Sequence, residues 1–139
     1  MIDVEALGPA RRQEIAADDD VVRVRQLVRA AAVESKLSLV DQTKLVTAAS
    51  ELARNTLVYG GGGYAEVQPV SNGRRRGIRV VFADEGPGIA DLDQAFTDGY
   101  TTGGGLGLGL SGARRLMDEF ELHTEVGAGT VITAVKWER

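Results

Sequence analysis

The chain has 139 residues, of which 43% are hydrophobic, so we expect one ordinary core and a single domain over residues 1–139. The 20 acidic and 16 basic residues give a net charge of −4, which argues against a nucleic-acid-binding protein, because such proteins gain most of their affinity by neutralising phosphates. The chain contains no cysteine, so disulfides and thiolate metal sites are excluded.

The sequence gives no sign of a signal peptide or of a membrane-spanning segment. Three consecutive acids, Asp18–Asp20, interrupt the first thirty residues, and no long apolar stretch follows. We therefore expect a cytoplasmic protein that has neither a membrane nor a nucleic acid as its partner.

The chain begins with a short strand and a helix. The strand is expected near residues 13–17, and Asp19 or Asp20 then caps a helix that runs to about Ser35. Apolar residues recur at helical spacing, so one face of this helix is expected to point into the core: Val24, Leu27, Val28 and Ala31.

A second helix is expected from Leu39 to about Val58. Ser38 stands three residues before Asp41, which is the pattern of a capping box. Four glycines at 60–63 end the helix. Its expected core-facing residues are Leu45, Ala49, Leu52 and Thr56.

Beyond the glycines the pattern changes from helical to extended. Residues 64–70 and 77–83 flank Asn72-Gly73, which is a strong hairpin signal, and a short helix is expected near residues 92–96. A helix from Leu110 to about Glu119 follows.

The last part of the chain predicts a second hairpin, with strands over residues 120–125 and 130–137 and a turn through residues 126–129. Helices precede and interrupt the two hairpins, so the class is α+β, with one sheet and its helices on one face.

Glu51 and Asn55 form the first candidate motif. They lie four residues apart on the second helix and so share one face, which can border a cleft. Mg²⁺ prefers oxygen ligands and keeps several waters, so the Asn55 amide oxygen and phosphate oxygens suffice to hold it. Glu51 is then free to accept a proton from an attacking hydroxyl, or to orient it. Taken alone, the pair better fits a surface glutamate and a helix-end asparagine, and it becomes informative only together with the motifs that follow.

The second motif follows the strand over residues 77–83. The Asp84 carboxylate can accept from an exocyclic amine, which favours adenine over guanine. Gly86 and Gly88 remove side chains where a base or ribose would lie against the backbone, and Pro87 stiffens the turn. Taken alone, the segment also fits an ordinary acidic turn.

The third motif, Gly103–Gly109, has five glycines in seven residues and leads into the helix at Leu110. Such a loop exposes N–H groups that bind anions, and the helix N-terminus adds further donors. The loop is therefore expected to wrap phosphates, and its glycine content suggests a lid. The alternative is a flexible linker.

These motifs together resemble the N, G1, G2 and GT boxes of the GHKL ATPase superfamily, which includes gyrase-type, Hsp90, MutL and histidine-kinase ATP-binding domains. The matching segments are Glu51–Asn55, Asp84–Gly88, Gly105–Leu110 and Gly129–Thr130. The resemblance implies the two-layer α/β sandwich of the Bergerat ATP-binding fold. In that fold a mixed, largely antiparallel sheet carries helices on one face, and ATP lies between the helices and the sheet.

The resemblance also implies residue roles, with ATP and Mg²⁺ as cofactors. Asn55 would coordinate Mg²⁺, and Glu51 would be the catalytic residue that activates the nucleophile. Asp84 would bind the adenine amine, with Thr130 assisting beside it. The remaining residues around the nucleotide would be Gly86, Gly88, Gly105, Leu106, Gly107, Leu108 and Gly109.

Finer similarity points to the RsbT-type stressosome switch kinases, through residues 50–55, 84–89, 98–102 and 114–120 and the closing Lys136-Trp137. Kinases of this type phosphorylate a serine or threonine of a STAS-domain antagonist. Once released, they bind and activate a PP2C-type phosphatase. The resemblance thus implies an ATP-dependent protein serine/threonine kinase in a bacterial sigma-factor stress response.

Two other functions fit the same motifs. One is an anti-sigma factor that sequesters a sigma factor in a nucleotide-dependent way. The other is a nucleotide-gated phosphatase activator whose own kinase turnover is incidental.

Overall fold

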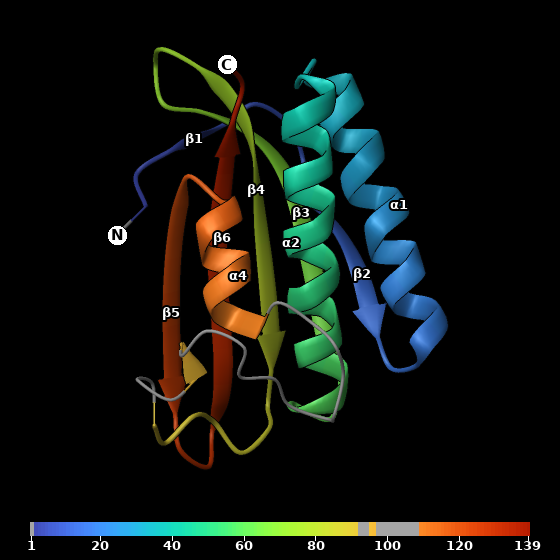
Figure 1. The fold of residues 1–139 in the computed structure, drawn as a ribbon, viewed down its shortest axis with the longest axis vertical. Helices are drawn as coiled ribbons and strands as arrows, with labels where there is room; N and C mark the ends of the chain where they lie inside the picture. The colour runs from blue at the N-terminus through green and yellow to red at the C-terminus, as the bar shows by residue number, and fades with distance from the viewer. Residues whose placement is uncertain (1, 92–94, 97–108) are drawn as a thin grey trace.

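The computed structural model describes residues 2–91, 95–96 and 109–139. Within them, three helices cover one face of a six-stranded sheet (Figure 1). The strands are β1 (Glu5–Ala6), β2 (Arg11–Ile15), β3 (Gly63–Ser71), β4 (Arg76–Asp84), β5 (Glu119–Glu125) and β6 (Gly129–Trp137). The helices are α1 (Asp18–Glu34), α2 (Leu39–Val58) and α4 (Gly109–Leu116). The predicted two-layer α+β fold is confirmed, with the difference that every strand pair in the described residues is antiparallel.

The sheet has the order β1-β3-β4-β6-β5, and β2 pairs with β3 on the same edge as β1. Strand β4 is central, and alternate residues on it, Ile78, Val80 and Phe82, are buried in the core. Asp84, the last residue of β4, lies in register between Gly63 of β3 and Thr130 of β6. The fold therefore carries this carboxylate to the end of the central strand.

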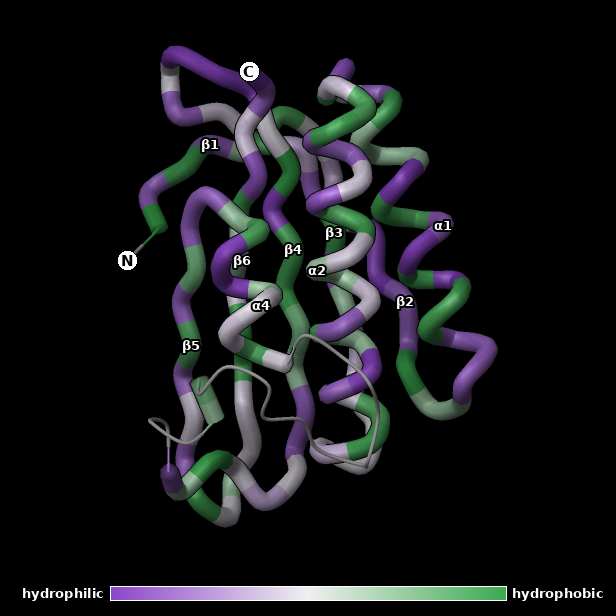
Figure 2. Tube along the Cα trace, viewed as in Figure 1, coloured by the Kyte–Doolittle hydropathy of each residue, from purple (hydrophilic) through white to green (hydrophobic). Residues whose placement is uncertain are grey.

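Helix α1 contributes an apolar stripe to the core, and Figure 2 shows the corresponding alternation of hydrophobic and hydrophilic residues along α1 and α2. Val24, Val28 and Ala31 are buried as predicted, while Leu27 is only partly buried. The predicted cap at Asp19 or Asp20 is wrong, because the N-cap residue is Ala17. The Asp20 carboxylate lies in the first turn, where Oδ2 accepts from the N–H groups of residues 16 and 17 at 2.8 and 3.1 Å.

Helix α2 starts as predicted, with the Ser38 hydroxyl oxygen accepting from the Asp41 N–H at 3.1 Å. The Asp41 side chain is buried and lies 3.9 Å from the Lys136 ammonium group of β6. All four predicted core-facing residues are buried: Leu45, Ala49, Leu52 and Thr56. The helix therefore presents the opposite side, with Glu51 on its margin, to the exterior.

Element boundaries differ from the predictions by a few residues. The first strand of the prediction corresponds to β2, which starts two residues earlier, and the two-residue strand β1 was not predicted. The β3–β4 loop includes Arg74 and Arg75, because their N–H groups both donate to the Asn72 side-chain oxygen. Helix α4 ends at Leu116, before the predicted end. The predicted helix near residues 92–96 lies mostly outside the described residues.

The sheet face away from the helices carries a smaller apolar cluster. Val70, Val135 and Trp137 are buried there, and Ile2 and Val4 from the start of the chain pack on them. No helix in the described part of the chain has the length and apolar character needed to cross a membrane.

Candidate functional site

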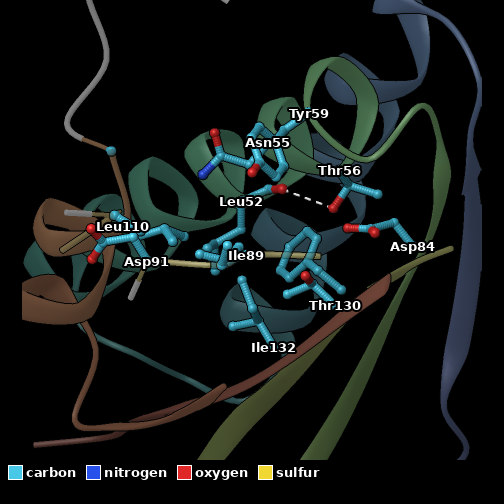
Figure 3. Close-up of a pocket in the computed structure, with 14 residues that line it drawn as sticks. Leu52, Asn55, Thr56, Tyr59, Asp84, Ile89, Asp91, Leu110, Thr130 and Ile132 are labelled. Carbon is cyan, nitrogen blue, oxygen red and sulfur yellow. Dashed lines mark hydrogen bonds between the residues drawn. The ribbon is translucent and has the colours of Figure 1, made fainter. Parts of the chain in front are cut away.

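A pocket opens where the C-terminal half of α2 meets the ends of β4 and β6 and the start of α4 (Figure 3). Asp84, Thr56 and Thr130 lie together at one end, and Leu110 and Asp91 lie at the other. Apolar side chains line much of the space between these ends: Leu52, Phe82, Ile89 and Ile132. An apolar slot with a few placed polar groups is typical of a small-molecule site.

The Asp84 carboxylate is held by one hydrogen bond and keeps one oxygen for a ligand. Its Oδ1 accepts from the Gly86 N–H at 2.9 Å. No donor from the described residues reaches Oδ2, although the side chain lines the pocket. A ligand that donates a hydrogen bond at this end of the slot would satisfy this oxygen.

Close backbone contacts fix the position of Asp84. A Cβ placed on Gly60 would lie 2.4 Å from Asp84 Cγ, and one on Gly129 would lie 2.2 Å from the Asp84 carbonyl oxygen. The Gly60 N–H also donates to the Asn55 carbonyl oxygen at 3.1 Å. Gly60 therefore links the end of α2 directly to the carboxylate of β4.

Sequence reasoning assigned Gly60 only to the end of the helix. The signal that could have revealed more is the number of glycines, since one residue suffices for a C-cap and Gly60–Gly63 supplies four. Gly63 is likewise placed against backbone, because an added Cβ would lie 1.9 Å from the Ala83 carbonyl oxygen.

Gly86 and Gly88 both lie close to neighbouring backbone. A Cβ on Gly86 would lie 2.7 Å from Gly60 Cα, and one on Gly88 would lie 2.3 Å from the Glu125 carbonyl oxygen. Both glycines thus make room for neighbouring backbone, and their predicted place beside a base or ribose stays a prediction. Gly88 also has a φ of 76°, a conformation that favours glycine.

Glu51 and Asn55 lie one turn apart on α2, as predicted, but only Asn55 lines the pocket. The Glu51 Oε1 accepts a hydrogen bond of 3.1 Å from the Gly109 N–H, at the start of α4. A carboxylate is stabilised there by the helix dipole and by the unpaired donors of the first turn. Glu51 therefore lies at the margin of the pocket. Its carboxylate contacts the N-terminus of α4, where the sequence predicts that phosphate binds. The predicted residues Gly105, Leu106, Gly107 and Leu108 lie outside the described residues.

Thr130 is buried beside Asp84, as the predicted assisting role requires. Its hydroxyl lies 2.8 Å from the Thr124 hydroxyl, which accepts from the Ile89 N–H at 2.9 Å. The Tyr59 hydroxyl donates to the Gly88 carbonyl oxygen at 3.2 Å. Thr124 and Tyr59 were missed by sequence reasoning, and together they hold the loop after β4 against β5 and α2.

The described residues contain no cluster of three or more His, Cys, Asp or Glu side chains that could bind a metal ion. Asn55 offers a side-chain oxygen at the pocket and has no hydrogen-bond partner for its amide among these residues. This donor set fits an ion such as Mg²⁺ that takes most of its ligands from a phosphate ligand and water.

Comparisons with known proteins agree with this architecture. Residues 40–138 match the family described as histidine kinase-, DNA gyrase B-, and HSP90-like ATPase. The chain is 46% identical over 120 residues to the serine/threonine-protein kinase RsbT of Bacillus subtilis (strain 168), an alignment that covers 86% of this chain and 90% of that protein. It is 28% identical over 119 residues to the anti-sigma F factor of Thermoanaerobacter sp. (strain X514), covering 81% of this chain and 82% of the relative.

Among solved structures, the RsbU and RsbW domains of Rv1364c from Mycobacterium tuberculosis superpose with a TM-score of 0.66 at 18% sequence identity. The match covers 95% of this chain and 33% of that one, so the chain spans about a third of that protein. At this level of identity the likeness concerns the fold.

Proposed function

The chain belongs to the family of histidine kinase-, DNA gyrase B- and HSP90-like ATPases, and from this premise we propose that it is an ATP-dependent protein serine/threonine kinase of a bacterial partner-switching system. The observation that carries the proposal is the 46% identity, over nearly the whole of both chains, to a relative named as such a kinase. The geometry of the pocket supports it in three respects.

First, the pocket suits an adenine base. The Asp84 Oδ2 is available to accept from the exocyclic amine, while Oδ1 is occupied by the Gly86 N–H. A guanine would present a carbonyl oxygen to this carboxylate and be repelled. The apolar walls formed by Ile89 and Ile132 suit the faces of a flat base.

Second, Asn55 lines the pocket about one helical turn from Glu51, and its side-chain oxygen would hold Mg²⁺. Bound Mg·ATP supplies the phosphoryl group and a counter-charge for it. The Asn55 backbone carbonyl accepts from the Gly60 N–H, and Gly60 lies against the Asp84 side chain. Asn55 would therefore hold the ion in a fixed position relative to Asp84.

Third, the position of Glu51 at the margin of the pocket supports a role in activating a protein hydroxyl. Its carboxylate accepts from the Gly109 N–H, a donor that also suits phosphate, so the two anions would compete for it. Glu51 released from Gly109 can accept the proton of a seryl or threonyl hydroxyl. We further propose that residues 105–109 neutralise charge on the transferred group.

The proposed protein substrate is a STAS-domain antagonist, and the proposed target after release is a PP2C-type phosphatase in the cytoplasm. Both come from the resemblance to the RsbT type, supported by the similarity to RsbT itself.

The test is intact-mass spectrometry of STAS-domain proteins incubated with this kinase and Mg·ATP. We expect a gain of one phosphate with the parent. The Glu51→Ala variant should bind ATP with parental affinity but transfer about 10²- to 10⁴-fold more slowly, because it lacks the proton acceptor. Glu5→Ala, which removes an exposed glutamate of β1 beside the end of β3 away from Asp84, is the matched control and should transfer at the parental rate. Parental transfer by Glu51→Ala would remove Glu51 from the catalytic role.

The similarity to anti-sigma F factors keeps a second function open, that of a nucleotide-dependent anti-sigma factor. Tight ATP binding without transfer to any STAS-domain protein, together with retention of a sigma factor in a pull-down, would favour it. Slow transfer with strong stimulation of a PP2C-type phosphatase would instead favour a nucleotide-gated activator.

A further inference from the structure

The exposed side of α2 carries positive charge, although the chain as a whole has a net charge of −4. Residues at alternating spacings of four and three lie on this side, opposite the buried residues of the helix. We name them the α2 outer face: Val40, Lys44, Thr47, Glu51, Arg54 and Val58. Val40 is 63% exposed and Val58 is 48% exposed, so both ends of the face are apolar and open.

The cations of the α2 outer face are not neutralised by the described residues. Lys44 and Arg54 are exposed, and neither forms an ion pair with any of them. The same holds for Arg25 and Arg29 on the neighbouring helix α1. Glu51 is the single acid among the residues of the face.

Two groups of acidic residues in the described structure lie away from the α2 outer face. Several lie on β5, where Glu119, Glu121 and Glu125 all point to the sheet face away from the helices. Others, Asp18–Asp20, lie in the first turn of α1. The α2 outer face thus carries two cations and one acid, a net positive charge on a protein that is acidic overall.

We propose that the α2 outer face docks an acidic surface of the protein substrate, and this inference rests on the proposed kinase function. A protein hydroxyl that reaches Glu51 must bring its surrounding surface over the same helix. Lys44 precedes Glu51 by about 10 Å along the axis, and Arg54 follows by about 5 Å, at a rise of ~1.5 Å per residue. Acidic residues on both sides of the phosphorylated serine or threonine would therefore be attracted to the kinase.

The apolar ends complete the surface. Val40 and Val58 are about 27 Å apart along the helix, a span that suits one side of an ordinary protein–protein interface. Aliphatic side chains of the substrate would cover them and exclude water from the ion pairs between them. The substrate surface that fits is therefore an acidic patch around the acceptor hydroxyl, bordered by apolar residues.

The test compares two charge reversals, Lys44→Glu on the α2 outer face and Arg75→Glu on the β3–β4 hairpin. Arg75 is also exposed and free of ion pairs to described residues, but it lies at the opposite end of β4 from Asp84, where Figure 1 shows the hairpin projecting from the sheet. Each variant changes the net charge by the same amount. The substrate is the STAS-domain protein that gains phosphate with the parent kinase.

With Lys44→Glu we expect the KM for the STAS-domain protein to rise about tenfold at low salt, while kcat and the ATP Kd stay within about twofold of the parent. The difference should shrink as salt screens the interaction. Arg75→Glu should leave all three constants unchanged. Replacing an acid beside the acceptor hydroxyl of the substrate by lysine should recover part of the loss in Lys44→Glu.

Equal KM values for the two variants would overturn the inference while leaving the kinase function intact. If the parent transfers no phosphate to any STAS-domain protein, the proposed function fails and the docking inference fails with it. Sedimentation of the kinase alone tests the competing occupant, a second copy bound through its acidic sheet face. Self-association that Lys44→Glu abolishes, without a change in KM, would assign the face to that copy and overturn the proposal.

Discussion

The two ends of helix α2 are held in place by different kinds of contact. At the N-terminal end, a buried lysine and two carboxylates join the helix to β6 and to the start of β5. At the C-terminal end, glycine backbone lies directly against the Asp84 carboxylate. The first arrangement uses long side chains and charge, while the second uses the absence of side chains.

The N-terminal end is a buried charge cluster. The Lys136 Nζ donates to the Leu116 carbonyl oxygen at 2.9 Å and lies 3.4 Å from Asp118 and 3.9 Å from Asp41. Only 3% of the Lys136 side chain is exposed. Asp118 also accepts from the Trp137 N–H at 2.8 Å. The cluster lies far along α2 from the pocket, so its contribution is to the stability of the fold.

The C-terminal end places ligand-binding groups with little tolerance. Asn55, Gly60 and Asp84 are connected through one backbone hydrogen bond and one contact that leaves no space for a Cβ. From this difference we expect stability and nucleotide binding to be separable along a single helix. Substitutions at one end should change the free energy of unfolding, and substitutions at the other should change the affinity for ATP.

The largest effect is expected from Lys136→Met. This change leaves the Asp41 and Asp118 carboxylates without their buried cation, so the free energy of unfolding should fall by about 3–5 kcal/mol. Urea unfolding measures this loss, and the exposed Lys44→Met is the control, expected within about 0.5 kcal/mol of the parent. Adding Asp41→Leu should recover part of the loss. A loss no greater than that of the control would show that the cluster does not secure this end of α2.

The next effect is expected from Gly60→Ala. The added Cβ would push the Asp84 carboxylate out of position, so ATP affinity should fall by about tenfold or more, a cost of roughly 1.4 kcal/mol. The adjacent Gly61→Ala is the control, because Gly61 has a φ of 76° and open space around its Cβ. It should lower stability by about 1 kcal/mol without changing affinity. Calorimetric titration of both variants measures their affinity for ATP and for the purine nucleotide that lacks the amine.

If Gly60 acts through Asp84, Gly60→Ala should also lose the preference for ATP over the amine-free nucleotide. An equal loss of affinity for both nucleotides would show that the substitution disturbs the pocket in general and would contradict the specific link.

The smallest effect is expected from Asp20→Ala, at a partly buried position in the first turn of α1. The Ala16 N–H, together with Arg23 and the Ala17 N–H, holds the pKa of Asp20 below its ordinary value of 3.8. A lowered pKa in the folded state means that the stabilisation is complete at neutral pH and is lost as the pH falls through the folded-state pKa. The variant should therefore be less stable than the parent at neutral pH, and the difference should vanish in acid. Urea unfolding of the variant and the parent, at neutral pH and in acid, measures this difference. A difference in the free energy of unfolding that does not change with pH would contradict the prediction.

The helices and hairpins could be predicted from sequence because their signals are local. Ser38 caps α2, and Asn72 closes the β3–β4 loop, through bonds that span only a few residues. The cap of α1 was wrong because three consecutive acids offer competing choices, and the sequence does not show that Asp20 bonds backward to residues 16 and 17.

The site was predictable in part. Asn55, Asp84 and Thr130, which the motifs assign to one site, line one pocket, whereas Glu51, predicted to face the same cleft, lies at its margin. The contact of Gly60 with Asp84 and the pairing of Asp41 with Lys136 could not be predicted, because each joins residues that only the folded sheet brings together. The assigned roles of these residues, and the glycines at 105–108, stay predictions.

Thermal unfolding with and without Mg·ATP, measured in parallel on the parent, Lys136→Met and Asp84→Asn, tests the separation of the two ends most directly. In Asp84→Asn the Oδ1 can still accept from the Gly86 N–H, but the second atom becomes a donor that cannot accept from the adenine amine. We predict that Lys136→Met unfolds at a lower temperature yet keeps the stabilisation by ATP, and that Asp84→Asn unfolds near the parental temperature and loses it. Parental stabilisation of Asp84→Asn by ATP would contradict the account.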